Sequence, residues 1–116
     1  MSSKKLYSVV NMEEIESISC PCGSTRRAFT EDPEQLASLH LVNIKKDSET
    51  HYHKKLTEIY FVLDGEGVME LDGERIPVKK GHSIMIKPGC RHRAVGELKI
   101  INIAIPVFDP DDEWFD

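Results

Sequence analysis

Short apolar segments follow one another closely from Leu39 to the end of the chain. Many are rich in β-branched and aromatic residues, and turn-forming residues such as Gly, Pro and Asp separate them, which favours strands over helices. Asp72-Gly73 predicts a two-residue hairpin, because both positions favour positive φ. The predicted strands are Ser38–Ile44, Glu58–Leu63, Val68–Leu71, Glu74–Val78, Ser83–Ile86 and Lys99–Ile105. Short, closely spaced strands indicate an antiparallel sandwich or barrel.

The first third of the chain has a different pattern. Asn11 and Glu14 have the spacing of a capping box, which predicts a short helix over Met12–Ser17. Asp32-Pro33 combines a capping residue with a proline suited to a first helical turn, and predicts at most one turn there. The fold class is therefore all-β, with short helical turns near the N-terminus.

Length and charge restrict the classes of function. A chain of 116 residues with 40% hydrophobic and 30% charged residues is sufficient for one globular domain. The formal net charge is −5 and the basic residues are dispersed, so we expect neither nucleic acid nor a membrane as partner. No apolar run reaches the roughly 20 residues of a membrane span, and no apolar region follows Lys4 and Lys5 as in a secretory signal.

The three cysteines are an odd number, so a disulfide framework is not expected and a reducing cytoplasm is the predicted location. Cys20 and Cys22 are one residue apart, which makes them poorly placed to bridge each other. No second pair completes a zinc site with them. Cys90 is interpreted as a small buried hydrophobic residue, although it lies close enough in sequence to His92 to approach a metal.

Four residues form a candidate metal site. His51 and His53 point to the same side if they lie on a strand, because side chains alternate. Glu58 begins the next predicted strand, and His92 follows a tight bend at Pro88-Gly89. Three imidazoles and one carboxylate suit a divalent transition metal better than calcium or magnesium. We predict one such ion, with manganese, iron, nickel and zinc as candidates.

These residues resemble the two conserved motifs of the cupin family. His51-x-His53, Glu58 and Gly65 are similar to the first motif, and Gly81, Pro88-Gly89 and His92 to the second. The resemblance implies an antiparallel jelly-roll barrel of six to eight strands, with the two histidines and the glutamate of the first motif and the histidine of the second as metal ligands. It also implies a homodimer, often formed through an N-terminal strand. The expected layout is a single domain with an extension (1–36) that holds a possible dimer-swapped strand, a barrel (37–107) and an acidic, aromatic tail (108–116).

Other side chains are candidates for ligand binding. Tyr60 lies two residues after Glu58, so its hydroxyl either lines the cavity, to orient a substrate or donate a proton, or belongs to the rim or core. Similar cupins run a strand along the barrel mouth in the region of Arg26 and Arg27, and alternation would turn one of the two inward. An inward arginine would bind a carboxylate or phosphate, whereas the alternative is a surface ion pair.

Several polar residues are given no role in the site. His40 and His82 are predicted to be structural or surface residues, and Arg91 and Arg93 to point away from the side on which His92 lies. Three aspartates, Asp109, Asp111 and Asp112, are interpreted as a solvated tail. The aromatic residues of that tail, Trp114 and Phe115, are expected to pack on the barrel or on a partner, with a lid as the alternative.

Three functional hypotheses follow. The first is a metal-dependent enzyme for a small, oxygen-rich, anionic metabolite, of the sugar or keto-sugar isomerase type, in which the metal polarises a carbonyl group. The second is an iron(II)-dependent dioxygenase with the same ligands. The third is a non-catalytic, metal-dependent binding module for a small molecule. The sequence does not choose among them, because one fold serves many reactions.

Overall fold

The computed structural model describes residues 5–116, and its fold is all-β. One 3-10 helix, η1 (Met12–Glu14), precedes the strands. The strands are β1 (Ile18–Cys20), β2 (Gly23–Ala28), β3 (Ser38–Ile44), β4 (Thr57–Leu71), β5 (Glu74–Lys79), β6 (Ser83–Ile86) and β7 (His92–Ile105). This arrangement confirms the expected fold class.

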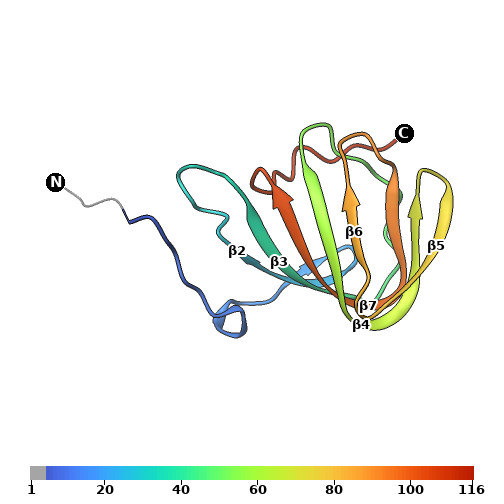
Figure 1. Ribbon diagram of the computed structural model, residues 1–116, viewed down its shortest axis with the longest axis horizontal. Coiled ribbons are helices and arrows are strands. Elements are labelled where there is room, and N and C mark those ends of the chain that lie inside the picture. Colours follow the sequence, from blue (N-terminus) through green and yellow to red (C-terminus); the bar gives the residue numbers. More distant parts are fainter. Residues whose placement is uncertain (1–4) are drawn as a thin grey trace.

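The strands form one antiparallel sheet in the order β1-β2-β3-β7-β4-β5, and β6 pairs with β4 beside this path. The long strands β4 and β7 pair from Thr57–Ile105 to Leu71–His92. Figure 1 shows both of them curving. The first half of β4 and the second half of β7 lie between β6 and β3 in one wall, whereas their other halves pair with each other and, through β4, with β5 in the second wall. Side chains from both walls meet in a core of Val42, Ile44, Val62, Met69, Val78, Ile86, Ala94, Leu98 and Ile100.

Alternation along β3 places one face of the strand in the barrel. Ser38, His40, Val42 and Ile44 are buried, whereas the residues between them are only partly buried. A period of two is expected for a strand with one buried face, and the predicted bounds of this strand, Ser38–Ile44, are confirmed. Strand β6 also matches its predicted range, and the hairpin at Asp72-Gly73 joins β4 to β5.

The prediction that a strand ends at Leu63, before Asp64-Gly65, is wrong. Strand β4 continues to Leu71, with a register shift between Val62 and Asp64 in its pairing with β7. Gly65 has a φ of 93°, and a Cβ there would collide with the carbonyl oxygen of Glu97 on β7. Glycine therefore lets the strand bend and cross from one wall to the other without a break in pairing. For the same reason β7 is longer than the predicted Lys99–Ile105.

The N-terminal segment combines the expected turn with an added hairpin. The Asn11 side chain caps η1 by accepting a hydrogen bond from the Glu13 amide, so the predicted helical turn is present but shorter than Met12–Ser17. Asp32-Pro33 forms hydrogen-bonded turns rather than a helix. Strands β1 and β2, which lie within the expected extension 1–36, join the sheet next to β3. Residues 1–4, part of the segment examined for a secretory signal, lie outside the described residues.

The outer face of the sheet is apolar where β3, β7, β4 and β6 lie side by side. Leu39, Ile103, Ile59 and Met85 face one another in one row across these four strands. In an isolated chain Met85 is 61% exposed. The homodimer expected from the sequence stays a prediction. Among residues 5–116, no helix is long and apolar enough to cross a membrane.

Candidate metal centre

The four predicted ligands come together at one end of the barrel. His51 and His53 lie in the connection between β3 and β4, Glu58 is near the start of β4, and His92 begins β7. The backbones of His51 and His92 exchange two hydrogen bonds, of 3.1 and 2.9 Å, and the His53 carbonyl accepts one from Gly89 at 2.8 Å. The expected strand at His51-x-His53 is only two isolated β-bridges, one at His51 and one at Tyr52. The bridge between His51 and His92 nevertheless holds the two cupin-like motifs against each other.

The three imidazoles have the arrangement of a metal site. One ring nitrogen from each of His51, His53 and His92 lies within 4.8 Å of the other two. The Nδ1 atom of each ring faces a backbone carbonyl, of Glu49, Asp112 and Cys90 respectively. A carbonyl only accepts hydrogen bonds, so each Nδ1 carries the proton. The Nε2 atoms are left for a metal, and the backbone fixes the orientation of the rings.

Glu58 lies between two of these rings. Its Oε1 is 3.1 Å from Nε2 of both His53 and His92, and its Oε2 accepts a hydrogen bond of 2.7 Å from Asn102. The carboxylate is 3% exposed. Burial raises the pKa of Glu58, but the hydrogen bonds from His53 and His92 outweigh it and hold the pKa well below its ordinary value. Glu58 is therefore ionised at neutral pH.

The donor set fits a transition metal ion. Two donors that occupy neighbouring positions of an octahedral ion, each about 2.1 Å from it, are about 3 Å apart. The distance of 3.1 Å from Glu58 Oε1 to the two imidazole nitrogens matches this spacing. With no metal bound, Nε2 of His53 can carry a second proton and donate it to Glu58. Burial lowers the pKa of His53. The contact with Glu58 raises this pKa by more than burial lowers it, so the pKa lies above its ordinary value.

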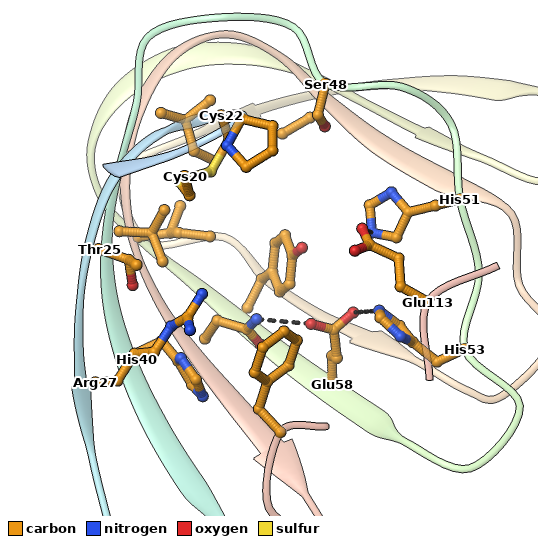
Figure 2. A pocket seen from close by; sticks show the side chains of 18 residues that line it. Cys20, Cys22, Thr25, Arg27, His40, Ser48, His51, His53, Glu58 and Glu113 are labelled. Carbon is orange, nitrogen blue, oxygen red and sulfur yellow. Dashed lines mark hydrogen bonds and ion pairs between the residues drawn. A yellow bond between two sulfur atoms is a disulfide. The ribbon is translucent and has the colours of Figure 1, made fainter. Parts of the chain in front are cut away.

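A cavity of about 160 Å³ extends from these ligands into the barrel. Figure 2 shows His51, His53 and Glu58 on one side of it and Arg27 and His40 on the other. Its floor is apolar and is formed by Val42, Ile44, Ala94 and Ile100. The cavity therefore combines a candidate metal position, a cationic side chain and an apolar floor within one small volume.

The two adjacent arginines point in opposite directions. Arg26 donates hydrogen bonds to the carbonyls of Met12 and Glu13, at 3.2 and 2.8 Å, and does not line the cavity. Arg27 lines the cavity, and its guanidinium carbon is 4.8 Å from the centre of the Phe108 ring. Its Nε is buried and has no hydrogen-bond partner within residues 5–116. Alternation on β2 thus turns Arg27 inward, with a donor left for a ligand.

Tyr60 lines the same cavity from β4, where it pairs with Asn102 of β7. Burial, followed by the negative charge of Glu58, raises the pKa of its hydroxyl well above 10. Tyr60 is therefore neutral throughout the physiological pH range, and its hydroxyl is a hydrogen-bond donor. Its ring also packs against the core. Tyr60 therefore both lines the cavity and belongs to the edge of the core, the two positions that the sequence left open.

His40 is buried on β3 and forms part of the cavity wall opposite the imidazole cluster. Its Nε2 is 2.7 Å from the hydroxyl of Ser38, and its ring packs edge-on against Phe108. Burial, with a smaller contribution from Arg27, lowers its pKa to about 4. His40 is thus a neutral structural residue, whereas His82 is exposed on the turn between β5 and β6.

The pKa of His40 predicts a pH dependence of stability. Because the unfolded chain binds a proton near pH 6.5 that the folded chain binds only near pH 4, the free energy of unfolding rises with pH between these values. Between pH 7 and pH 4 we expect His40 to account for a loss of about 3 kcal/mol in metal-depleted protein. Urea unfolding at several pH values measures it, and His40→Gln should flatten the dependence. An unchanged slope in the variant would contradict the prediction.

The expectation that Cys20 and Cys22 are poorly placed to bridge each other is wrong, because the structure joins them in a disulfide. Their Cα atoms are 5.3 Å apart, within the usual range, since the chain reverses direction at Cys20-Pro21-Cys22 between β1 and β2. The turn lies at the rim of the cavity (Figure 2). Cys90 is a free, partly buried thiol packed against the core, and burial raises its pKa.

The interpretation of Asp112 as a solvated tail residue is also wrong. Asp112 is 3% exposed, and its carboxylate accepts hydrogen bonds of 2.9 to 3.1 Å from the amides of Lys54, Lys55 and Leu56. It also accepts one from the Trp114 indole, and its carbonyl accepts the Nδ1 proton of His53. The loop that follows His53 is therefore closed by a residue almost sixty positions away.

The rest of the C-terminal segment packs on the same loop. Trp114 exchanges two backbone hydrogen bonds with Tyr52, of 3.0 and 2.9 Å, and the Lys54 ammonium lies over its indole ring. Arg91 stacks on Tyr52 and pairs with Asp116, so it points away from the cavity as predicted. Trp114 thus packs on the connection between β3 and β4 that carries His51 and His53.

Sequence reasoning missed three polar residues of the site, namely Asn102, Asp112 and Glu113. Asn102 holds Glu58, Asp112 holds His53, and Glu113 lines the cavity beside His51. Each contact joins residues more than forty positions apart, and no local pattern marks it. Only the strand register, which sets Tyr60 opposite Asn102, would have located one of them.

The chain belongs to the cupin family, since residues 38–101, more than half of its length, match the cupin domain. An uncharacterized protein of Methanocaldococcus jannaschii is 41% identical over 71 residues, which are 56% of this chain and 57% of that protein. Acireductone dioxygenase of Tuber melanosporum is 25% identical over 114 residues, 93% of this chain and 65% of that enzyme. The chain spans less than two thirds of the length of these relatives.

Solved structures agree with the family assignment. A protein from Planctomyces limnophilus has a TM-score of 0.89 and 46% identity, over 95% of this chain and 97% of that one. The nucleoside dehydratase Pac13 of Streptomyces has a TM-score of 0.78 at 22% identity, over 96% of this chain and 89% of that one. At this identity the likeness to Pac13 concerns the fold.

Proposed function

We propose that the chain is a metal-dependent enzyme that acts on a small, oxygen-rich, anionic metabolite. The observation that carries the proposal is a single cavity with two unlike walls. One wall presents His51, His53 and Glu58, and the other presents the inward guanidinium of Arg27. A cavity of about 160 Å³ limits the ligand to a small molecule. The opposed charges favour a molecule with an anionic group at one end and oxygen ligands at the other.

The metal site proposed here consists of His51, His53, Glu58 and His92, and it would hold one divalent ion. Three nitrogens and one carboxylate oxygen favour manganese, iron, nickel or zinc over calcium and magnesium. When bound, such an ion polarises a carbonyl oxygen as a Lewis acid.

The remaining cavity residues have separate tasks in this proposal. Arg27 binds the carboxylate or phosphate of the substrate, and its guanidinium group is held by stacking on Phe108. Asn102 holds the carboxylate of Glu58 in place. The neutral hydroxyl of Tyr60 orients a substrate oxygen or donates a proton to it. These tasks suit proton transfer next to a carbonyl group, as in sugar or keto-sugar isomerisation.

A second candidate is an iron(II)-dependent dioxygenase that uses the same four ligands. It is favoured by the similarity to acireductone dioxygenases, at 25% identity in Tuber melanosporum over 93% of this chain. A third, the non-catalytic binding module, would bind the same ligands without turning them over. The protein–metal contacts are common to all three, so the reaction must be distinguished by experiment.

The proposal is tested by elemental analysis of protein purified without a metal-affinity column, combined with oxygen-uptake assays on small sugar acids and keto-sugars. We expect about one transition metal ion per chain and substrate turnover without oxygen uptake. Iron together with substrate-dependent oxygen uptake would favour the dioxygenase instead. Saturable binding with no turnover across the panel would favour the binding module.

The two adjacent arginines provide a matched pair for testing the anion site. Arg27→Ala is expected to weaken binding of a small sugar acid about tenfold to a hundredfold, because a charge-assisted hydrogen bond is lost in a partly buried cavity. Arg26→Ala removes the same charge one residue away, outside the cavity, and should change the affinity less than about twofold. Titration calorimetry measures both. Equal losses, or none in Arg27→Ala, would contradict the assignment.

A further inference from the structure

The C-terminal segment holds Glu113 next to the candidate metal centre. Its two neighbours in sequence are both anchored, since the buried Asp112 carboxylate binds three loop amides and Trp114 pairs with Tyr52. The backbone of Glu113 is therefore fixed on both sides. A solvated tail would leave this residue in water, but here it is fastened beside the connection that carries His51.

The side chain of Glu113 is directed into the cavity. Its Oε1 is 3.7 Å from Nε2 of His51, the nitrogen that faces the candidate metal position, and Figure 2 shows the carboxylate beside that ring. The carboxylate has no ion pair with Lys or Arg within residues 5–116. At 39% exposure the side chain is partly free to move. Within residues 5–116, the ion-pair contact of this carboxylate is therefore with a candidate metal ligand, His51.

We propose that Glu113 is a fifth protein donor to the metal ion, an inference that rests on the site proposed at His51, His53, Glu58 and His92. Four donors leave two positions on a six-coordinate ion. Neighbouring donors are about 3 Å apart, so the Glu113 oxygen is less than about 1 Å from such a spacing to His51. It lies outside the group formed by the ring nitrogens of His51, His53 and His92, so the carboxylate has to turn towards the other two rings as well. The side chain is 39% exposed, which leaves room for a change of rotamer.

A fifth donor changes what the site offers to a ligand. With Glu113 bound, one position of a six-coordinate ion remains open, so a ligand that binds through two oxygens has to displace the carboxylate. The displaced carboxylate would stay beside the bound molecule, because its backbone is anchored at Asp112 and Trp114. The C-terminal segment would then supply a metal ligand itself, in addition to supporting His53 through Asp112.

Cobalt(II) is a suitable probe, since its visible absorption depends on the number and type of its donors. We would titrate it into metal-depleted wild type, Glu113→Gln and Asp111→Asn, and record affinity and spectrum. Glu113→Gln keeps the shape but replaces the carboxylate. The exposed Asp111, two residues away, loses the same charge without facing the cavity. We expect about ten- to hundredfold weaker binding and an altered spectrum in Glu113→Gln only.

Two results would overturn the role of Glu113 and leave the four-ligand site intact. One is a wild-type affinity and spectrum in Glu113→Gln. The other is an equal loss of affinity in both variants with an unchanged spectrum, which would mean that only the charge matters. If wild type itself binds no cobalt stoichiometrically, the proposed metal site fails, and the inference about Glu113 fails with it.

Discussion

Replacing His53 with alanine is expected to abolish stoichiometric metal binding and to leave the barrel folded. His53 is 4% exposed, and its Nε2 lies 3.1 Å from the carboxylate of Glu58. Removing one of four donors should weaken binding of a divalent ion by roughly a hundredfold or more. Elemental analysis of purified variant and wild type, with titration of metal into depleted protein, measures this loss.

The surface residue His82 supplies the control for this experiment. It is an exposed histidine on the turn between β5 and β6, so His82→Ala should retain the metal content of wild type. Circular dichroism should show the same β-sheet signal for both variants, because the core does not include His53. One tightly bound metal ion per chain in His53→Ala would contradict the site assignment.

Replacing Asp112 with alanine is expected to lower the free energy of unfolding by about 3 kcal/mol, or the midpoint of thermal unfolding by about 10 °C. Its carboxylate accepts hydrogen bonds from the amides of Lys54, Lys55 and Leu56, and the variant leaves these donors without that acceptor. Burial raises the pKa of Asp112, but these hydrogen bonds outweigh it and lower the pKa. The stabilisation is therefore present above pH 4 and is lost in acid.

The loss should extend to the metal site, because the carbonyl of Asp112 accepts the Nδ1 proton of His53. A shifted C-terminal segment should weaken metal binding by about tenfold to a hundredfold. Thermal unfolding and metal titration of Asp112→Ala are to be compared with Asp111→Ala, in which an exposed aspartate is removed from the same segment. A midpoint within about 2 °C of wild type would show that the segment is not held by this carboxylate.

The parts of the fold that the sequence predicted well are those with a local cause. Alternation of apolar and polar residues sets the strand Ser38–Ile44, and Asp72-Gly73 sets a hairpin, because each depends only on neighbouring residues. The bend at Gly65 was taken for the end of a strand. A glycine that ends a strand and a glycine that lets a strand pass close to Glu97 give the same local pattern.

In the candidate site, too, the residues predicted from the sequence are those with a local cause. Its histidines and glutamate were found because their spacing within two short motifs is local. Asp112 and Glu113 were assigned to solvent or overlooked, since their roles depend on contacts with residues 51 to 56 that only the folded chain creates. The disulfide between Cys20 and Cys22 was missed because a tight turn brings together two residues that would lie apart in an extended chain.

The order of the strands places the proposed anion site and the candidate metal donors on different parts of the sheet. Arg27 lies on β2, whose hairpin with β1 forms one end of the sheet, whereas Glu58 and His92 lie on the central pair β4 and β7. Substitutions in the terminal hairpin can therefore alter the proposed anion site without disturbing the strands that position the candidate metal donors. In the proposed enzyme, substrate preference could therefore change at the edge of the sheet while the candidate metal centre stays the same, which makes β1 and β2 the strands to engineer for a new substrate.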